Sequence, residues 1–87
     1  MDIGKAMMEI REEAGISRKE MATKLKIRPQ SLWKIEKGMT YPKPKTIAQF
    51  CVAAKVPMAC LYMRAMEKED YRWPDDPARA GVRQDND

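Results

Sequence analysis

The chain has 87 residues, of which 44% are hydrophobic and 34% charged, and its formal net charge is +4. This length allows one domain with a modest core. The sequence shows no secretory signal and no run of the roughly 20 apolar residues that span a bilayer. We therefore expect a soluble, cytoplasmic protein with no membrane segment. The absence of histidine and of a glycine-rich phosphate loop excludes the usual zinc sites and histidine-dependent nucleophiles, so we predict no enzyme activity, no cofactor and no metal.

Two helices are predicted in the first 25 residues. Apolar residues recur at helical spacing from Ile3, and Gly15 follows where a helix end needs positive φ, so the first helix runs to about Ala14. Ser17, with Glu20 three residues later, forms a capping box that opens a short second helix. The residues expected to face the core are Ile3, Met7, Ile10, Ala14, Met21, Ala22 and Leu25.

A third helix is predicted to begin at Pro29, after a very short turn, and to be closed by Gly38. Proline suits the first helical position because its missing N–H costs nothing there. At about 100° per residue, Leu32 and Ile35 fall on one side of this helix. The opposite side carries Pro29, Gln30, Trp33, Lys34 and Lys37. We therefore predict that one side packs in the core and that the other contacts a ligand.

Two further helices are predicted, one from Pro44 to Ala54 and one starting at Pro57. Their inward residues are expected to be Ile47, Phe50, Cys51, Ala54, Met58, Leu61 and Tyr62. No segment alternates like a strand, so the predicted fold is all-α with five helices. The end of the chain is polar and broken by prolines, and we divide the protein into a domain at residues 1–66 and a polar C-terminal tail at residues 67–87.

The chain has two cysteines, Cys51 and Cys60. We expect both to be small packing residues or unreactive thiols, because no metal-ligand spacing includes them. A redox switch is the alternative.

Positive charge is concentrated in the middle of the chain. Residues 18–45 hold nine basic and two acidic side chains, a net charge of +7, whereas residues 1–17 carry −2 and residues 69–87 carry −3. A lysine cluster is often only a solvated face, but this density favours binding to a polyanion.

These features resemble a known family, the lambda repressor and Cro-like helix-turn-helix domains, also called the XRE family. The resemblance spans residues 3–62 without a gap and is carried by REEAGISRKEMATKL, IRPQSLWKIEKG, Pro42 and the AAKVP segment. In such domains the second helix of the motif lies in the DNA major groove and the first crosses the backbone. The resemblance assigns these roles to residues 27–37 and 17–25. It implies a transcriptional regulator, a repressor, that binds double-stranded DNA sequence-specifically.

The resemblance also implies which side chains contact DNA. Gln30 would offer its amide to adenine and Lys34 would donate to guanine, both common pairings in the major groove. Ser31 and Trp33 complete the base-reading set. Trp33 would lie against a thymine methyl or a sugar edge, or alternatively pack against a neighbouring helix. The phosphate contacts are assigned to Arg18, Lys19, Arg28, Lys37, Lys43 and Lys45.

Three residues depart from the family pattern. Pro29 stands where a polar, base-reading side chain is common, and Arg28 replaces the usual small cap, so base readout rests on fewer residues. Arg18 stands where the family often has a glutamine that holds a phosphate, which keeps the role but changes the geometry.

Arg11 and Glu36 match positions that pair in the family, and we expect a partly buried ion pair that sets the angle of the third helix.

The fifth helix is predicted to form a homodimer interface. Ala59, Met63 and Met66 leave more apolar surface there than a monomer of this size needs. Alternatively, the tail folds back and covers these residues with Tyr71 or Trp73. The acidic tail with its two aromatic residues also favours a second function, a protein-interaction module such as an antitoxin-like partner, in which DNA binding is secondary or lost.

Overall fold

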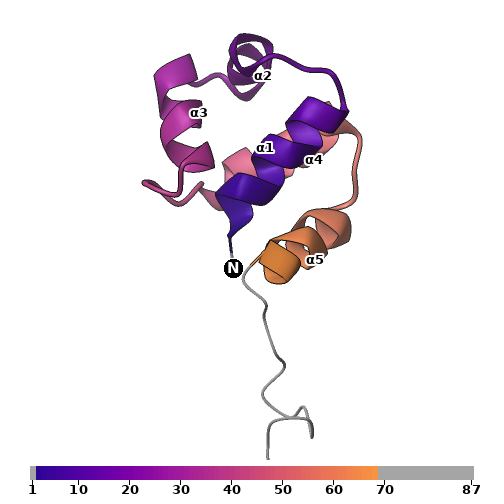
Figure 1. Ribbon diagram of the computed structural model, residues 1–87. Helices are drawn as coiled ribbons and strands as arrows, with labels where there is room; N and C mark the ends of the chain where they lie inside the picture. Colours follow the sequence, from indigo (N-terminus) through magenta and orange to yellow (C-terminus); the bar gives the residue numbers. More distant parts are fainter. Residues whose placement is uncertain (1, 69–87) are drawn as a thin grey trace, which may run out of the picture.

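The computed structural model describes residues 2–68, which form five α-helices (Figure 1). The helices are α1 (Ile3–Glu13), α2 (Arg18–Leu25), α3 (Pro29–Glu36), α4 (Pro44–Ala54) and α5 (Met58–Lys68). α1 and α4 occupy the middle of the molecule, with α2 and α3 at one end and α5 at the other. The predicted all-α, five-helix fold is confirmed. Residues 67 and 68 of the predicted tail belong to α5, and the rest of it, with Tyr71 and Trp73, lies outside the described residues.

One hydrophobic core joins all five helices. Each helix contributes one of the largest fully buried side chains, and these are Met7, Met21, Leu32, Phe50 and Leu61. Burial of such a side chain contributes roughly 1.5–3 kcal/mol, so no helix is attached only by its ends. α1 packs against α3 and α5, and α2 packs against α3 and α4. Both α2 and α3 are therefore fixed to the core and to each other.

Several helix ends follow the signals predicted from the sequence. The backbone N–H of Glu20 donates to Ser17 Oγ at 3.0 Å, which confirms Ser17 as the N-cap of α2. Gly15 and Gly38 follow α1 and α3 with φ of 72° and 78°. This left-handed conformation costs a glycine little, and both helices stop where it occurs.

Two other helix ends carry no such signal. Lys26 after α2 and Lys55 after α4 adopt φ of 58° and 60°, which a residue with a Cβ rarely does. In each case the N–H groups of the lysine and of the next residue donate to carbonyls in the last turn of the helix. Both helices therefore end in the local hydrogen-bond pattern that accompanies a left-handed residue, with a lysine in the place where glycine is usual.

Two residues predicted to lie in the core are exposed. Ala14 is exposed because α1 ends at Glu13, and the inward position after Ile10 is taken by Arg11. Met58 is 42% exposed, since it starts α5 while the core contacts of that helix run through Leu61 and Ala65. The other predicted inward residues of α4 and α5 are buried or, like Ala54 and Tyr62, partly buried against the core.

The two cysteines have different environments. Cys51 is buried in α4, and Cys60 is exposed on α5. Burial raises the pKa of the Cys51 thiol, with a smaller contribution from nearby Cys60, so the reactive thiolate of Cys51 is disfavoured. Cys51 thus packs as a small hydrophobic residue, as predicted.

Within residues 2–68, no single helix has the length and apolar character needed to cross a membrane. α4 and α5 meet those two criteria only when taken together, and they are bent by 106° relative to each other.

Gly4 allows α1 and α3 to approach closely. A Cβ atom at this position would lie 1.9 Å from the carbonyl oxygen of Ile35. We expect Gly4→Ala to lower the free energy of unfolding by about 1–3 kcal/mol, despite the better helix propensity of alanine, because the α3 backbone has to move. Thermal and urea unfolding would measure the loss. Lys5→Ala, at an exposed position of the same helix, is the control, and a Gly4→Ala variant as stable as the parent would contradict the close contact.

Candidate nucleic-acid interface

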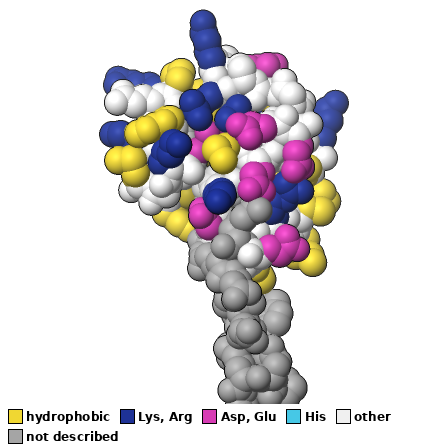
Figure 2. Space-filling view, in the orientation of Figure 1, with side chains coloured by type: hydrophobic (Ala, Val, Ile, Leu, Met, Phe, Trp, Pro, Cys, Tyr) yellow, Lys and Arg dark blue, Asp and Glu magenta, His cyan; other side chains and the backbone are white. Residues whose placement is uncertain are grey.

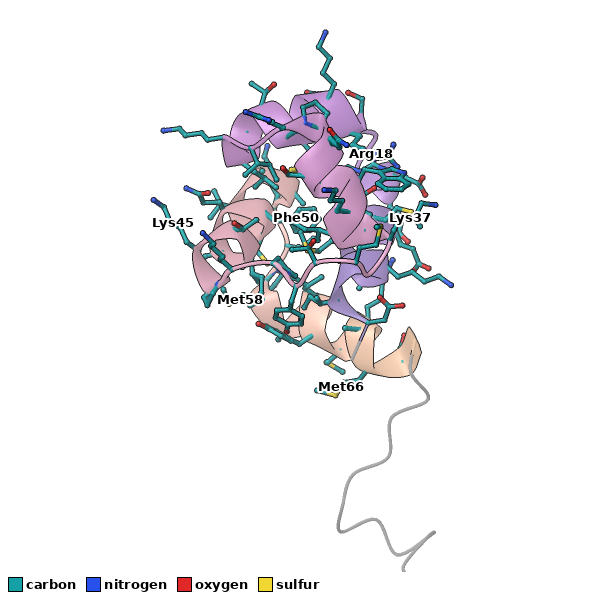
Figure 3. All side chains as sticks on the ribbon, turned by 90° about the vertical axis from the view of Figure 1, so that its left-hand side faces the viewer. Arg18, Lys37, Lys45, Phe50, Met58 and Met66 are labelled. Carbon is teal, nitrogen blue, oxygen red and sulfur yellow. The ribbon has the colours of Figure 1, made fainter. Side chains whose placement is uncertain are left out.

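α3 has a buried face and an exposed face, as the sequence predicts. Leu32 and Ile35 are buried in the core, together with Glu36. The exposed residues are Pro29, Gln30, Ser31, Trp33, Lys34 and Lys37. Figure 3 looks onto α3 from this side. The helix thus presents a polar, basic and aromatic surface to solvent.

The turn between α2 and α3 fixes the angle between them. Leu25 ends α2 and Pro29 begins α3, so only three residues connect the two helices. Lys26 takes the left-handed conformation, and the N–H of Ile27 donates to the carbonyl of Ala22 at 3.0 Å. Ile27 is also partly buried against the core. Two short helices joined by such a tight turn form a helix-turn-helix arrangement.

A buried ion pair joins the end of α3 to α1. Arg11 Nε donates to Glu36 Oε2 at 2.7 Å, and Arg11 Nη2 donates to Oε1 at 3.3 Å. Arg11 Nη1 donates to the carbonyl of Ile16 at 2.9 Å. Glu36 and Arg11 are only 4% and 6% exposed. The predicted pair is therefore confirmed, and it is more deeply buried than expected.

Glu36 has a second partner that the sequence did not indicate. Arg18 Nε donates to Glu36 Oε1 at 3.0 Å, and the Arg18 side chain remains 37% exposed. Arg18 was predicted to contact phosphate, and that role stays a prediction. Its side chain starts from the first residue of α2 and reaches the end of α3, so it bridges the two helices.

Most residues predicted to bind phosphate lie around α3. In Figure 3, Arg18 and Lys37 lie on one side of the helix and Lys45 lies on the other. The remaining members are Lys19, Arg28 and Lys43, and all of these lysines and Arg28 are exposed. A helix flanked by cations on both sides matches the arrangement of phosphates on the two edges of a DNA groove. The contacts themselves remain predictions.

A groove of about 430 Å³ lies between α3 and the loop that follows it. Ser31 and Lys34 from α3 line it together with Lys43 at the N-cap of α4. Two residues of this loop, Met39 and Tyr41, were not among the predicted contact residues, although they are 63% and 62% exposed. The sequence feature that could have revealed them is their position in the segment after Gly38, which is rich in lysine and proline. Large apolar residues exposed in a basic loop indicate a contact surface.

Trp33 lies on the exposed face of α3 with 39% of its surface accessible. This value leaves part of the indole packed against the protein and part available to a ligand. Contact with a thymine methyl or sugar edge therefore stays a prediction, beside the alternative of packing alone.

Acidic side chains gather on a different surface. Figure 2 shows them mainly over α1 and the adjoining part of α5, whereas basic and hydrophobic side chains occupy the edge where α3 lies. On that acidic surface, Arg64 of α5 pairs with Glu9 and Glu13 of α1. The charge separation seen along the sequence is therefore also a separation in space, and a polyanion would be oriented towards α3.

The residues predicted to form a dimer interface lie on α5. Ala59 is exposed, Met63 is 63% exposed and Met66 is partly buried. Met58 adds to the exposed apolar area of the helix. The homodimer remains a prediction.

The model of the helix-turn-helix family matches residues 7–59 of the chain. Two crystal structures of the clp gene regulator ClgR from Corynebacterium glutamicum have a similar fold, each with 22% sequence identity. One match covers 79% of this chain and 73% of the other, with a TM-score of 0.77. The second covers 77% and 87%, with a TM-score of 0.74. No curated protein matches the sequence significantly.

The pair of Arg11 and Glu36 can be tested by removing one partner. We expect Arg11→Ala to lower the free energy of unfolding by about 3 kcal/mol, because it leaves the buried carboxylate without its main partner. Arg64→Ala is the matched control, since its pairs with Glu9 and Glu13 are at the surface and their loss changes stability little. Thermal unfolding of both variants makes the comparison. Equal midpoints for Arg11→Ala and the parent would show that the pair does not hold α3.

Proposed function

The chain belongs to the helix-turn-helix family of the lambda repressor/Cro-like (XRE) type, whose members are DNA-binding transcriptional regulators, and we propose that it binds specific double-stranded DNA sequences as a homodimeric repressor. The observation that carries the proposal is the exposed face of α3. Leu32, Ile35 and the one acid of α3, Glu36, are buried, so beyond Pro29 the helix presents polar, basic and aromatic groups. A cytoplasmic location follows from this function.

Base reading is proposed for the exposed residues of α3. The major groove is about 12 Å wide and admits one α-helix. Gln30, in the first turn of α3, donates to and accepts from an adenine edge, and Lys34, one turn later, donates to guanine O6 or N7. Ser31 and Trp33 lie between them on the helix and contact neighbouring bases or sugars.

Phosphate binding is proposed for the cations on either side of α3. Lys43 stands at the N-cap of α4, where no side chain caps the helix, so its ammonium group and the free N–H groups of the first turn attract the same anion. Lys37 and Arg18 hold the opposite edge of the groove. Each neutralised phosphate releases counterions, so binding weakens steeply as salt rises.

Dimerisation through α5 is proposed because one reading helix covers too few base pairs for useful discrimination. A twofold contact through Ala59, Met63 and Met66 would bury apolar area and place two copies of α3 about one DNA turn, roughly 34 Å, apart. Such a dimer covers promoter DNA on one face, which agrees with repression.

Base reading and phosphate binding differ in their dependence on sequence. We expect Gln30→Ala and Lys34→Ala each to lose about 1–3 kcal/mol on the preferred site and to relax its sequence at one position. Lys43→Ala is the control, because it should weaken all sequences alike and reduce the salt slope by about one. Fluorescence anisotropy on a site selected from genomic DNA and on a random duplex measures both effects. The assignment fails if Lys34→Ala weakens the two duplexes by the same factor.

The dimer is tested by placing charge on α5. We expect Met63→Glu with Met66→Glu to give a folded monomer whose operator affinity is much reduced, because two carboxylates would be buried in a twofold contact. Val52→Glu, at a 78% exposed position of α4, is the control and should leave the dimer intact. Analytical ultracentrifugation measures the mass in each case. A monomeric parent at high concentration, or a dimeric double variant, excludes this interface.

A further inference from the structure

The buried carboxylate of Glu36 has two guanidinium partners, which differ in their exposure to solvent. Arg11 Nε donates to Oε2 at 2.7 Å, and Arg18 Nε donates to Oε1 at 3.0 Å. These three side chains together carry one positive charge, and Glu12 Oε2 lies 3.9 Å from Arg11 Nη2. The Arg11 side chain is 7% exposed and that of Arg18 is 37% exposed, so Arg18 is the guanidinium of this cluster that reaches solvent.

The two arginines also differ in how many of their donors are used. Arg11 bonds through Nε and both Nη atoms, to Glu36 and to the carbonyl of Ile16. Arg18 bonds only through Nε, and within residues 2–68 its two Nη atoms have no protein acceptor. A guanidinium anchored through Nε keeps its Nη groups as a planar fork, the shape that binds a phosphate through two parallel hydrogen bonds.

We propose that Glu36 is a positioning residue for DNA binding, which holds Arg18 through Nε so that both Nη groups bind one backbone phosphate beside α3. This inference rests on the proposed function and extends it. An arginine fixed before binding loses less side-chain entropy on binding, which is worth a factor of roughly 3–10 in affinity. One carboxylate thereby connects the scaffold, through Arg11, with the DNA contact, through Arg18.

The position of Arg18 agrees with this role. It is the first residue of α2, the helix that crosses the DNA backbone in this fold. In Figure 3 its side chain lies at the edge of α3, on the same side as Lys37. In the opposite arrangement Glu36 would compete with phosphate for Arg18, and removal of the Glu36 carboxylate would then strengthen DNA binding.

The first experiment compares two replacements of Arg18. A lysine keeps the charge, but its single ammonium group binds either Glu36 or the phosphate. We therefore expect Arg18→Lys to weaken DNA binding almost as much as Arg18→Ala does, so that the dissociation constants of the two variants differ by less than about twofold. Both should reduce the salt slope by about one. Lys5→Arg, at an exposed position of α1 outside the proposed interface, is the control for charge-conserving exchange and should change affinity less than twofold. An Arg18→Lys variant that binds like the parent, or an Arg18→Ala variant that binds as tightly or more tightly, overturns the proposal.

A double-mutant cycle tests the role of Glu36 itself. We expect Glu36→Gln to weaken DNA binding about 3-fold to 10-fold in the parent and less than twofold when combined with Arg18→Ala. Circular dichroism at the assay temperature shows whether each variant is folded. Equal losses in the two backgrounds would mean that Glu36 acts only through the fold, and this overturns the proposal. If Glu36→Gln does not fold, the comparison of Arg18→Lys with Arg18→Ala decides.

Nuclear magnetic resonance of the arginine side chains gives a readout that stability does not affect. On addition of duplex DNA, the Nε–H group of Arg18 should keep the chemical shift of a hydrogen-bonded group. Rotation of its Nη groups should slow, and their signals should sharpen. Loss of the Nε–H hydrogen bond would show that phosphate displaces Glu36, which contradicts the proposal. Failure of the proposed function is distinct, because the parent would then bind neither the genomic site nor a random duplex, and Lys34→Ala and Lys43→Ala would have no effect.

Discussion

The orientation of α3 depends on two consecutive residues that contact α1. The carbonyl of Ile35 lies so close to Gly4 that only a residue without a side chain fits there, and Glu36 is held by Arg11 from 25 residues away in the sequence. The first contact limits how near the helices come, and the second limits how far α3 can turn about its own axis. All the predicted base-reading residues are on α3, so these two contacts set the direction in which they point.

Burial of Glu36 also shapes the electrostatic surface. Residues 18–45 contain two acids, and the structure removes one of them from solvent by pairing it with arginines. Glu9, Glu12 and Glu13 lie on α1 instead. The surface around α3 is therefore more positive than the charge of the segment alone implies, and long-range attraction would bring a polyanion to this side first.

Local signals in the sequence were enough to predict all five helices, the N-cap Ser17, Pro29 as the first residue of α3, and the buried side of α3. The errors at Ala14 and Met58 arose at helix ends, because α1 stops at Glu13 and the core contacts of α5 run through Leu61 and Ala65. The close contact at Gly4 could not be predicted, because it depends on the distance between two helices. The bond from Arg18 to Glu36 was missed for the same reason, since it joins residues 18 positions apart whose proximity the fold creates.

The three-residue connection between α2 and α3 has a consequence for how new specificities arise in this scaffold. A turn with Lys26 in the left-handed conformation and Pro29 at the next helix start has almost no freedom to bend, so the two helices behave as one rigid body. Such a body cannot adapt to a different operator by tilting. The exposed residues of α3, however, lie outside the hydrophobic core, to which the helix contributes Leu32 and Ile35. They can be substituted one residue at a time while the arrangement of α2 and α3 stays the same. The exposed surface of α3 is therefore the place to change when the DNA sequence preference is to be redesigned.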